Sequence, residues 1–380
     1  MTPKKEKIRL AVCISDFRIG GAQKIVADLV NHLNTDRYEV HLITFFLSEK
    51  EDTFHSILRN GVHVHKLNWN KFTDLRSWFE TYKLLKLLKP DIVFSHLYFS
   101  NFITRCLKPF ISYKVIVVEH NIYASKTSLQ IFFDRLLAKL TYKIVAVSKG
   151  VASFTSQQER ISIKKFIIIP NGVDVDCLYR QSTFEKIREV KKELDVKSAN
   201  KIIITIGQLI RQKNHTLLIE AFSKFINGYP DYRLVILGGG SGKKTLTTLV
   251  KDLSIEDSII FPGIKNEVGP YLAAANFFVL PSLFEGFGIV CIEAMAMGLP
   301  VISTRVTGPD SYIKDGKNGL FTDGTVSDLV DKMSAIADLN EERMSVYKNN
   351  AIRTANLFRI DEVIREYENL FEESIKSNLP

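Results

Sequence analysis

The chain has 380 residues, more than one hydrophobic core usually organises, so its length favours two domains. Hydrophobic residues make up 46% and charged residues 24%, ordinary globular values that exclude a disordered or fibrous chain. The net charge is +9 and uneven: residues 1–180 hold 27 lysines and arginines against 16 acidic residues, whereas residues 181–380 hold 24 against 26. A basic first half is expected to attract anionic partners, such as nucleic acid, lipid headgroups or a phosphorylated acceptor.

We expect a cytoplasmic protein. The apolar stretch at 10–14 is too short for a secretory signal and is followed by Asp16 and Arg18. No stretch reaches the roughly 18 apolar residues that span a bilayer, so any membrane contact is expected to be peripheral. The four cysteines lie far apart without a CxxC pair or a histidine at ligand spacing, which is typical of reduced thiols rather than of zinc ligands or disulfides.

The first predicted elements are near-continuous Val/Ile strands that alternate with amphipathic helices, a pattern typical of a parallel sheet covered on both faces. Gly20 and Gly21 connect the first strand to a helix at 22–33. The predicted strands of this half lie at 8–15, 39–46, 62–66, 92–96, 115–119, 144–148 and 166–169.

The same pattern restarts near residue 201. Strands are predicted at 201–206, 233–238, 259–261, 277–281 and 300–304, with helices at 215–226, 244–253, 269–275 and 289–297. The proline and glycine at 170–172 mark the boundary. We therefore predict an α/β protein with two Rossmann-like, doubly wound domains that face each other across a cleft. They span 1–172 and 173–355, and a terminal helix at 356–380 is expected to pack back toward the first domain.

Ligands of open α/β sheets sit beyond the carboxyl ends of the strands, and the strand at 277–281 is followed by a glycine loop and a helix. Gly286 and Gly288 allow the backbone to approach a ligand closely, and the helix start favours an anion. Glu285 lies in the loop and Glu293 about one turn inside the helix. Such carboxylates are expected to accept hydrogen bonds from sugar or ribose hydroxyls. The alternative is a helix-entry charge and a solvated helix residue.

The loop after the strand at 201–206 carries two cations. Arg211 and Lys213, two positions apart, could clamp a diphosphate, with each charge-assisted contact contributing roughly 1.5 to 3 kcal/mol. The alternative is a solvated loop with two surface charges.

Glycines also follow the strand at 233–238. The Gly238–Lys243 segment fails the Walker A pattern, because Leu237 stands where its first glycine belongs and Lys244 where Ser or Thr belongs. We interpret it as a tight turn that leaves room for a flat base.

Three features of the first half follow strands in the same way. Gly20 and Gly21 open a helix and suit close approach to phosphate or sugar. His96 and His120 stand at two strand ends. A lone histidine is more often structural than catalytic, but its place beside the expected cleft makes His120 a candidate.

Together these motifs resemble the retaining GT-B glycosyltransferases of family 4, and the resemblance covers nearly the whole chain. The matching residues are Gly20 and Gly21, the Pro-Asn-Gly-Val-Asp at 170–174, Gly207, Leu209, Lys213 and Asn214, and the Glu285 to Glu293 pair with Gly-Phe-Gly between. One departure is the Thr-Gly-Pro-Asp-Ser segment at 307–311, where many members have Gly-Gly-x-x-Glu.

The resemblance implies a role for each matching residue. Arg211 and Lys213 would hold the donor diphosphate, Glu293 the ribose, and Glu285 the sugar hydroxyls, while His120 would contact the donor sugar. The residues expected to be catalytic are Glu285, His120, Arg211 and Lys213. Those expected to bind the donor are Gly21, Gly207, Arg211, Lys213, Gly238, Ile264, Glu285, Gly286, Phe287, Gly288, Ile289 and Glu293.

The resemblance also implies the reaction: metal-free, retaining transfer from a nucleotide-sugar, with UDP expected ahead of GDP, to a glycan or polyprenyl-linked acceptor of the cell envelope. No cofactor is expected. The segments 98–110 and 126–140 mix apolar and basic residues, including Arg105 and Lys126, at helical spacing, which favours peripheral contact with an anionic membrane. The alternative is that both helices pack on the sheet with their cations outward.

Two other functions are compatible with parts of the sequence. A sugar-nucleotide epimerase of GT-B architecture would bind the same donor without an acceptor, but the glutamate pair and the cation loop favour transfer. A nucleic-acid-binding protein is indicated by charge alone and lacks aromatic residues interleaved on a basic sheet, so we expect no nucleic acid partner.

Overall fold

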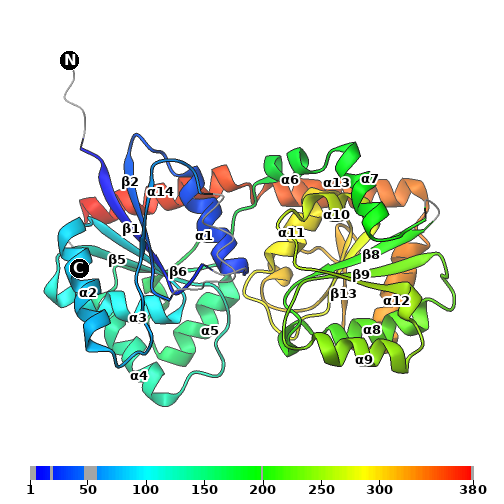
Figure 1. Ribbon diagram of the computed structural model, residues 1–380, viewed down its shortest axis with the longest axis horizontal. Coiled ribbons are helices and arrows are strands. Elements are labelled where there is room, and N and C mark those ends of the chain that lie inside the picture. Colours follow the sequence, from blue (N-terminus) through cyan, green and yellow to red (C-terminus); the bar gives the residue numbers. More distant parts are fainter. Residues whose placement is uncertain (1–5, 18–19, 47–57, 198–199, 378–380) are drawn as a thin grey trace. The chain divides into compact units, whose positions relative to one another are not determined.

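The computed structural model describes residues 6–17, 20–46, 58–197 and 200–377. The chain divides into two compact units, Met1–Gly172 with Ile360–Pro380 as unit 1 and Val173–Arg359 as unit 2. Both are parallel sheets with helices on their two faces (Figure 1). The chain is therefore a two-domain, Rossmann-like α/β protein.

Unit 1 contains a seven-stranded parallel sheet in the order β3-β2-β1-β4-β5-β6-β7. The strands are β1 (Ile8–Ile14), β2 (Tyr38–Thr44), β3 (Val62–Lys66), β4 (Ile92–His96), β5 (Lys114–Glu119), β6 (Lys143–Ala146) and β7 (Phe166–Ile168). The helices are α1 (Gly21–His32), α2 (Leu75–Leu88), α3 (Tyr98–Leu107), α4 (Ser128–Leu137), α5 (Lys149–Glu159) and α14 (Ile360–Lys376). The central strands are buried on both faces, which explains their unbroken Val/Ile runs.

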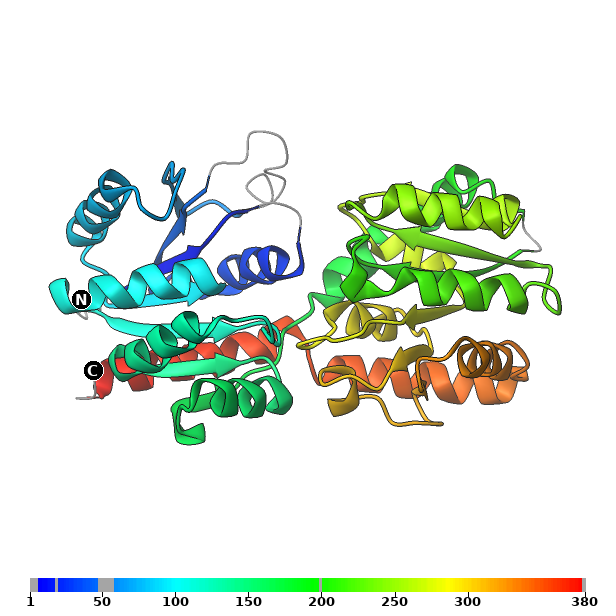
Figure 2. The same cartoon turned by 90° about the horizontal axis from the view of Figure 1, so that it is seen from below.

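The last helix, α14, is part of unit 1 although its sequence follows unit 2. It lies beside α1, and its Phe371 ring packs edge-on against Tyr38 of β2 and Phe94 of β4. In Figure 2 it runs as a red helix along this unit. An aromatic face thus anchors the end of the chain to the first sheet.

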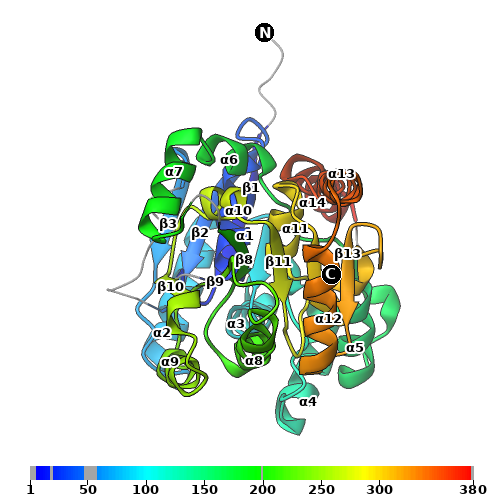
Figure 3. The ribbon, with the colours of Figure 1, turned by 90° about the vertical axis from the view of Figure 1, so that its right-hand side faces the viewer.

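Unit 2 contains a six-stranded parallel sheet in the order β10-β9-β8-β11-β12-β13 (Figure 3). The strands are β8 (Lys201–Ile206), β9 (Tyr232–Leu237), β10 (Ile259–Gly263), β11 (Phe277–Leu280), β12 (Val301–Thr304) and β13 (Gly319–Thr322). The helices are α6 (Val175–Gln181), α7 (Phe184–Glu193), α8 (His215–Phe225), α9 (Lys243–Asp252), α10 (Gly269–Ala274), α11 (Ile289–Ala296), α12 (Val326–Ala337) and α13 (Glu341–Asn356).

Unit 2 continues to Arg359, four residues beyond the expected end of the second domain. The backbone N–H of Val173 donates to the carbonyl of Phe358 at 2.8 Å, and Val173 also pairs with Arg359 as an isolated bridge. These contacts tie the end of α13 to the start of the unit. The sequence did not predict β13, α12 or α13.

Each sheet reverses its strand order at one point, between β1 and β4 in unit 1 and between β8 and β11 in unit 2. The carboxyl ends of the two strands that flank such a point form the usual ligand site of an open α/β sheet. In unit 2 these ends lead into the two loops that carry Lys213 and Glu285.

Within the part of the chain that the structure describes, no helix is both long and apolar enough to cross a membrane.

Candidate active site

Lys213 and Glu285 are in direct contact at the strand-order reversal of unit 2. Lys213 ends the short 3-10 helix η5 (Arg211–Lys213) after β8, and its Nζ lies 2.5 Å from Oε1 of Glu285. The hydroxyl of Ser282 donates to the same carboxylate oxygen at 2.8 Å. The Lys213 side chain is 18% exposed and that of Glu285 8%. The ion pair is therefore partly accessible at the ends of two adjacent strands.

The backbone joins these two loops to each other. The N–H of Leu283 donates to the carbonyl of Gln212 at 2.8 Å, and the Gln212 amide donates back to the carbonyl of Phe284 at 2.9 Å. Gly207 lies beneath the Lys213 side chain, because an added Cβ would be 3.3 Å from its methylene carbons. Lys213 thus has a defined path across the end of β8.

The start of α11 lies beside this pair. Gly288 precedes the helix with φ +73°, a conformation that favours glycine, and Ile289 is its first residue. The hydroxyl of Tyr312 approaches the carbonyls of both Phe287 and Gly288, at 2.9 and 3.0 Å. The Gly286–Gly288 loop is therefore held from its carbonyl side, while the free N–H groups of the first helical turn remain available for an anion.

The segment at 307–311, which departs from the family pattern, supports the same loop. Gly308 donates its N–H to the carbonyl of Glu285 at 3.3 Å, and an added Cβ there would be 2.4 Å from Cα of Phe287. Gly308 is thus required by the close backbone approach.

Glu293 lies one turn inside α11 and is 2% exposed. Glu293 is therefore buried from water, which contradicts the alternative interpretation of a solvated helix residue. Its neighbour Cys291 is also buried, and burial raises the pKa of the thiol, so this cysteine is an uncharged core residue.

Arg211 differs from Lys213. It is exposed, and it makes no ion pair with the residues that the structure describes. Ile264, which follows β10, is 44% exposed and lies against Gly239. Both side chains reach solvent near the strand ends and are accessible to a ligand.

The glycines after β9 have a structural cause that the sequence interpretation missed. Gly238 has φ +144°, and an added Cβ would be 1.9 Å from the carbonyl oxygen of Gly207. At Gly240, with φ +153°, it would be 2.8 Å from the carbonyl of Leu209. The glycines allow the β8 and β9 loops to pack backbone to backbone, which positions the loop that carries Lys213.

The remaining predicted residues, Gly21 and His120, belong to unit 1. Gly21 is the first residue of α1, and an added Cβ there would meet nothing within 4 Å. His120 follows β5, and its Nε2 lies 2.9 Å from Nδ1 of His96 at the end of β4. Burial lowers the pKa of His120 to about 4, so the ring is neutral at physiological pH. His96, which had no assigned role, is thus its direct partner.

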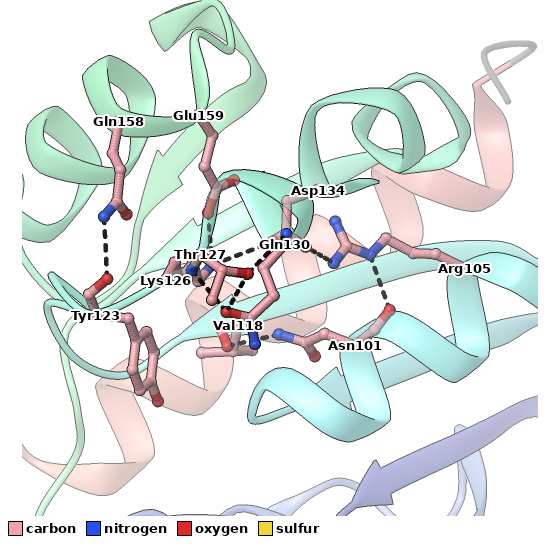
Figure 4. Close-up of polar contacts among 10 residues, drawn as sticks. All are labelled: Asn101, Arg105, Val118, Tyr123, Lys126, Thr127, Gln130, Asp134, Gln158 and Glu159. Atoms are coloured by element: carbon pink, nitrogen blue, oxygen red, sulfur yellow. Dashed lines mark hydrogen bonds and ion pairs between the residues drawn. The ribbon is translucent and has the colours of Figure 1, made fainter. Parts of the chain in front are cut away.

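The sequence interpretation of two basic residues in unit 1 is wrong. Arg105 and Lys126 do not face outward but are buried in an ionic network (Figure 4). Lys126 contacts Asp134 at 2.9 Å and Glu159 at 2.5 Å, and Arg105 contacts Asp134 at 2.6 Å. Burial also raises the pKa of Glu119 beside them. These cations join α3, α4, α5 and the loop after β5.

Among the residues that the structure describes, no cluster of three or more His, Cys, Asp or Glu side chains is arranged to hold a metal ion.

Two Rossmann-like units, each a parallel sheet between helices, are the architecture of the GT-B class of fold. Two family models match the chain: "Glycosyltransferase Family 4" over residues 19–177 and "Glycosyl transferases group 1" over residues 186–353. The chain therefore belongs to the family 4 glycosyltransferases and is a glycosyltransferase enzyme.

Curated relatives agree with this assignment, and a solved structure shares the fold. A Campylobacter jejuni N-acetylgalactosaminyltransferase, named for a diphospho-undecaprenol-linked acceptor, is 28% identical over 94% of this chain and 98% of its own. An Escherichia coli galactosyltransferase, named for UDP-Gal and a diphosphoundecaprenol-linked acceptor, is 24% identical over 98% of each. HepE from Anabaena, solved with UDP and glucose, superposes with a TM-score of 0.86 at 17% identity over 96% of this chain and all of its own.

Proposed function

We propose that this protein is a retaining, metal-independent glycosyltransferase of cell-envelope polysaccharide or glycoconjugate synthesis. It moves a sugar from a nucleotide-sugar, with UDP expected ahead of GDP, to a glycan or polyprenyl-linked glycan. The observation that carries the proposal is the contact between Lys213 and Glu285 beside the start of α11. The two undecaprenol-linked acceptors in the relatives' names support the acceptor class, and the nucleotide bound to HepE supports UDP.

The cations of the β8 loop act on the leaving group. As the bond from the anomeric carbon to the phosphate oxygen breaks, negative charge builds on the nucleoside diphosphate. Lys213, the exposed Arg211 and the N–H groups at the start of α11 stabilise this charge in place of a metal ion. When Lys213 turns to the diphosphate, the Glu285 carboxylate keeps the Ser282 hydrogen bond and accepts hydrogen bonds from the sugar hydroxyls.

Retention follows if the acceptor hydroxyl attacks the face that the leaving group vacates. The hydroxyl oxygen bonds to the anomeric carbon, and its proton passes to the leaving phosphate oxygen. Glu285 keeps the Ser282 hydrogen bond and serves as a hydrogen-bond acceptor for the sugar hydroxyls, and we expect no sugar to become attached to it. A glycosylated Glu285 peptide, trapped with donor alone and found by mass spectrometry, would contradict this mechanism.

The donor is tested by thermal shift of the full chain with UDP-, GDP- and ADP-sugars. A donor at a hundred times its dissociation constant stabilises by roughly 2.7 kcal/mol, and we expect Lys213→Met to lose this shift. Incubation with the stabilising donor alone then separates transfer from epimerisation. A transferase releases sugar and nucleotide slowly, whereas an isomerised nucleotide-sugar as the product would overturn the proposal in favour of an epimerase.

We also propose that unit 1 works at the cytoplasmic face of an anionic membrane, through a surface that we call the α2–α4 band. Phe72 and Phe132 are 43% and 59% exposed, and rings in contact connect them across α3. The ring centroids are 5.2 Å apart for Phe72 and Phe102, 5.8 Å for Phe102 and Phe133, and 5.7 Å for Phe133 and Phe132. An apolar strip thus extends from Phe72, which lies just before α2, across α3 to α4.

The band also includes further exposed apolar side chains of both helices. On α4, Leu129 and Leu136 are 64% and 48% exposed and lie at helical spacing with Phe132. On α2, Leu75, Phe79 and Leu87 are 82%, 54% and 78% exposed. The exposed cations Lys83, Lys86, Arg135 and Lys139 lie on the same two segments. Apolar side chains flanked by cations match an anionic bilayer surface.

The band is tested with vesicles of phosphatidylglycerol and phosphatidylcholine. We expect a variant with Leu129→Gln, Phe132→Gln and Leu136→Gln to sediment with these vesicles far less than the wild type. The matched control is Phe184→Gln with Leu357→Gln, since these unit 2 residues are 77% and 72% exposed but lie outside the band. Equal sedimentation of the two variants at low salt would remove the membrane proposal.

A further inference from the structure

His96 and His120 form a hydrogen-bonded imidazole pair at the ends of two neighbouring strands of unit 1. Nδ1 of His96 lies 2.9 Å from Nε2 of His120, and the rings stack with centroids 5.2 Å apart and planes 29° apart. His96 is fully buried at the end of β4, and the Phe94 ring packs edge-on against it at 4.4 Å. The pair therefore has one fixed geometry.

Both rings are neutral at physiological pH. Burial lowers the pKa of His96 well below its usual value, as does the positive charge that His120 would carry, and burial alone lowers the pKa of His120 to about 4. Glu119, next to His120 in sequence, belongs to the buried cluster around Lys126 and Arg105. Among the residues that the structure describes, no carboxylate therefore holds His120 in its charged form.

A neutral pair places a single proton between the two facing nitrogens, because each neutral imidazole has one N–H and one acceptor nitrogen. If His96 donates from Nδ1, then His120 has its own proton on Nδ1. If His120 donates from Nε2 instead, its Nδ1 is an acceptor and His96 has its proton on Nε2. The tautomer of one ring thus dictates that of the other.

The outer nitrogens of the pair are unused by the protein. His120 Nδ1 and His96 Nε2 are both buried and find no hydrogen-bond partner among the residues that the structure describes. A buried polar atom without a partner is unfavourable and is usually satisfied by water or a ligand. A neutral nitrogen suits a hydroxyl, which can donate or accept, rather than a phosphate.

We propose that His96 is a positioning residue that fixes the orientation of the His120 ring and couples the tautomers of the two rings, so that His120 Nδ1 offers a ligand hydroxyl a defined hydrogen bond. This inference rests on the proposed function for the identity of the ligand, but the pairing of the two rings is independent of it. His96 itself touches no substrate.

Three substitutions of His96 separate positioning from packing. Asparagine places a polar atom two bonds beyond Cβ, where Nδ1 of histidine lies, so His96→Asn keeps the bond to His120. His96→Gln places its amide one bond too far, and His96→Leu has no polar atom. We expect the Gln and Leu variants to lose roughly tenfold in kcat/KM for the nucleotide-sugar, and the Asn variant to stay within about threefold of the wild type.

The dissociation constant of the free nucleotide separates positioning from a packing defect, because only a packing defect would weaken nucleotide binding. The nucleotide lacks the sugar, so its dissociation constant should be nearly the same in the wild type and all three variants. Equal losses in nucleotide affinity and in kcat/KM, or unchanged kcat/KM in His96→Leu, would overturn the inference.

Nuclear magnetic resonance of the full chain with ¹⁵N-labelled histidine tests the pairing without any activity. The signals of the His120 ring are assigned by their loss in His120→Asn. In the wild type we expect this ring to show one protonated and one unprotonated nitrogen that do not titrate between about pH 5.5 and 8. In His96→Leu we expect these signals to change. A His120 ring that titrates near pH 6.5 or is insensitive to His96→Leu would refute the pairing. A wild type that turns over no nucleotide-sugar but shows the expected signals would refute the proposed function alone.

Discussion

Both units bury a lysine against carboxylates at the carboxyl edge of a parallel sheet, and the two sites differ in how fully the charge is matched. Lys126 of unit 1, whose side chain is 6% exposed, contacts both Asp134 and Glu159. Lys213 of unit 2, 18% exposed, contacts Glu285. Each follows a strand, β5 or β8. The strand-end rule therefore selects both lysines and does not separate structure from function.

The two lysines differ in whether a ligand could replace one of their protein partners. Lys126 joins a loop to α4 and α5. Its ammonium also lies over the rings of Tyr98 and Tyr123, so two carboxylates and two aromatic rings already surround it. Lys213 lies beside the start of α11, which attracts anions. We propose that a ligand phosphate replaces the Glu285 carboxylate as the partner of Lys213. We therefore propose that the number of buried partners separates a lysine that holds the fold, Lys126, from one that binds a ligand, Lys213.

The largest expected effect comes from Lys126→Met. Removal of the cation leaves Asp134 and Glu159 buried without it, which should lower the free energy of unfolding by about 3 to 5 kcal/mol. Urea denaturation followed by circular dichroism measures this loss. Lys139→Met, at an exposed lysine of the same segment, is the control and should change stability by less than about 0.5 kcal/mol. Equal effects of the two variants would show that the network adds little.

Lys213→Met, by contrast, should lower activity more than stability. We expect turnover to fall about a hundredfold to a thousandfold. The free energy of unfolding should fall by roughly 1 to 3 kcal/mol, less than for Lys126→Met, because Lys213 is more exposed and Glu285 keeps the Ser282 hydrogen bond. Steady-state transfer assays and urea denaturation on one preparation measure both. The exposed Lys244 of α9 supplies the control, Lys244→Met, with neither effect. A Lys213 variant that unfolds readily yet keeps its turnover would assign this ion pair to structure.

Tyr312→Phe tests whether the loop before α11 needs the support of the Tyr312 hydroxyl. The substitution removes the hydroxyl that donates to the carbonyls before α11 but retains the ring packed against Phe287 and Phe358. We expect a loss of about 1 kcal/mol in stability and a several-fold fall in turnover, since the helix start loses its support. Both should be measured beside Tyr347→Phe, on a half-buried tyrosine of α13. Unchanged turnover in Tyr312→Phe would show that the loop needs no such support.

The sequence predicted most of the framework because its signals are local. Runs rich in Val and Ile identified the strands of both sheets except β13, and chain order placed Lys213 and Glu285 at strand ends. By contrast, the partners of these residues depend on packing. Tyr312 reaches a carbonyl 25 residues away, and His96 meets His120 across 24 residues. The outward orientation expected for Lys126 was wrong because helical spacing does not reveal the Glu159 carboxylate on another helix.

The smallest expected effect concerns the protonation state of Glu159 in the Lys126 network. Two cations, Lys126 and Arg105, face the carboxyls of Glu119, Asp134 and Glu159, and burial raises the pKa of Glu159 to about 7 although Lys126 opposes this. Folding then takes up a proton between the ordinary carboxyl pKa and about pH 7. The contribution of Glu159 to stability is therefore fully present at low pH and is lost as pH rises through 7.

Glu159→Gln removes this dependence, so the stability of the wild type relative to the variant should fall by on the order of 1 kcal/mol between about pH 5 and pH 8. Urea denaturation at both pH values gives the difference directly. Glu342→Gln, at an exposed glutamate of α13, serves as the reference and should show no such slope. A wild type that gains relative stability as pH rises would mean that Glu159 is ionised beside Lys126, and the network would then resemble the simple ion pair of unit 2.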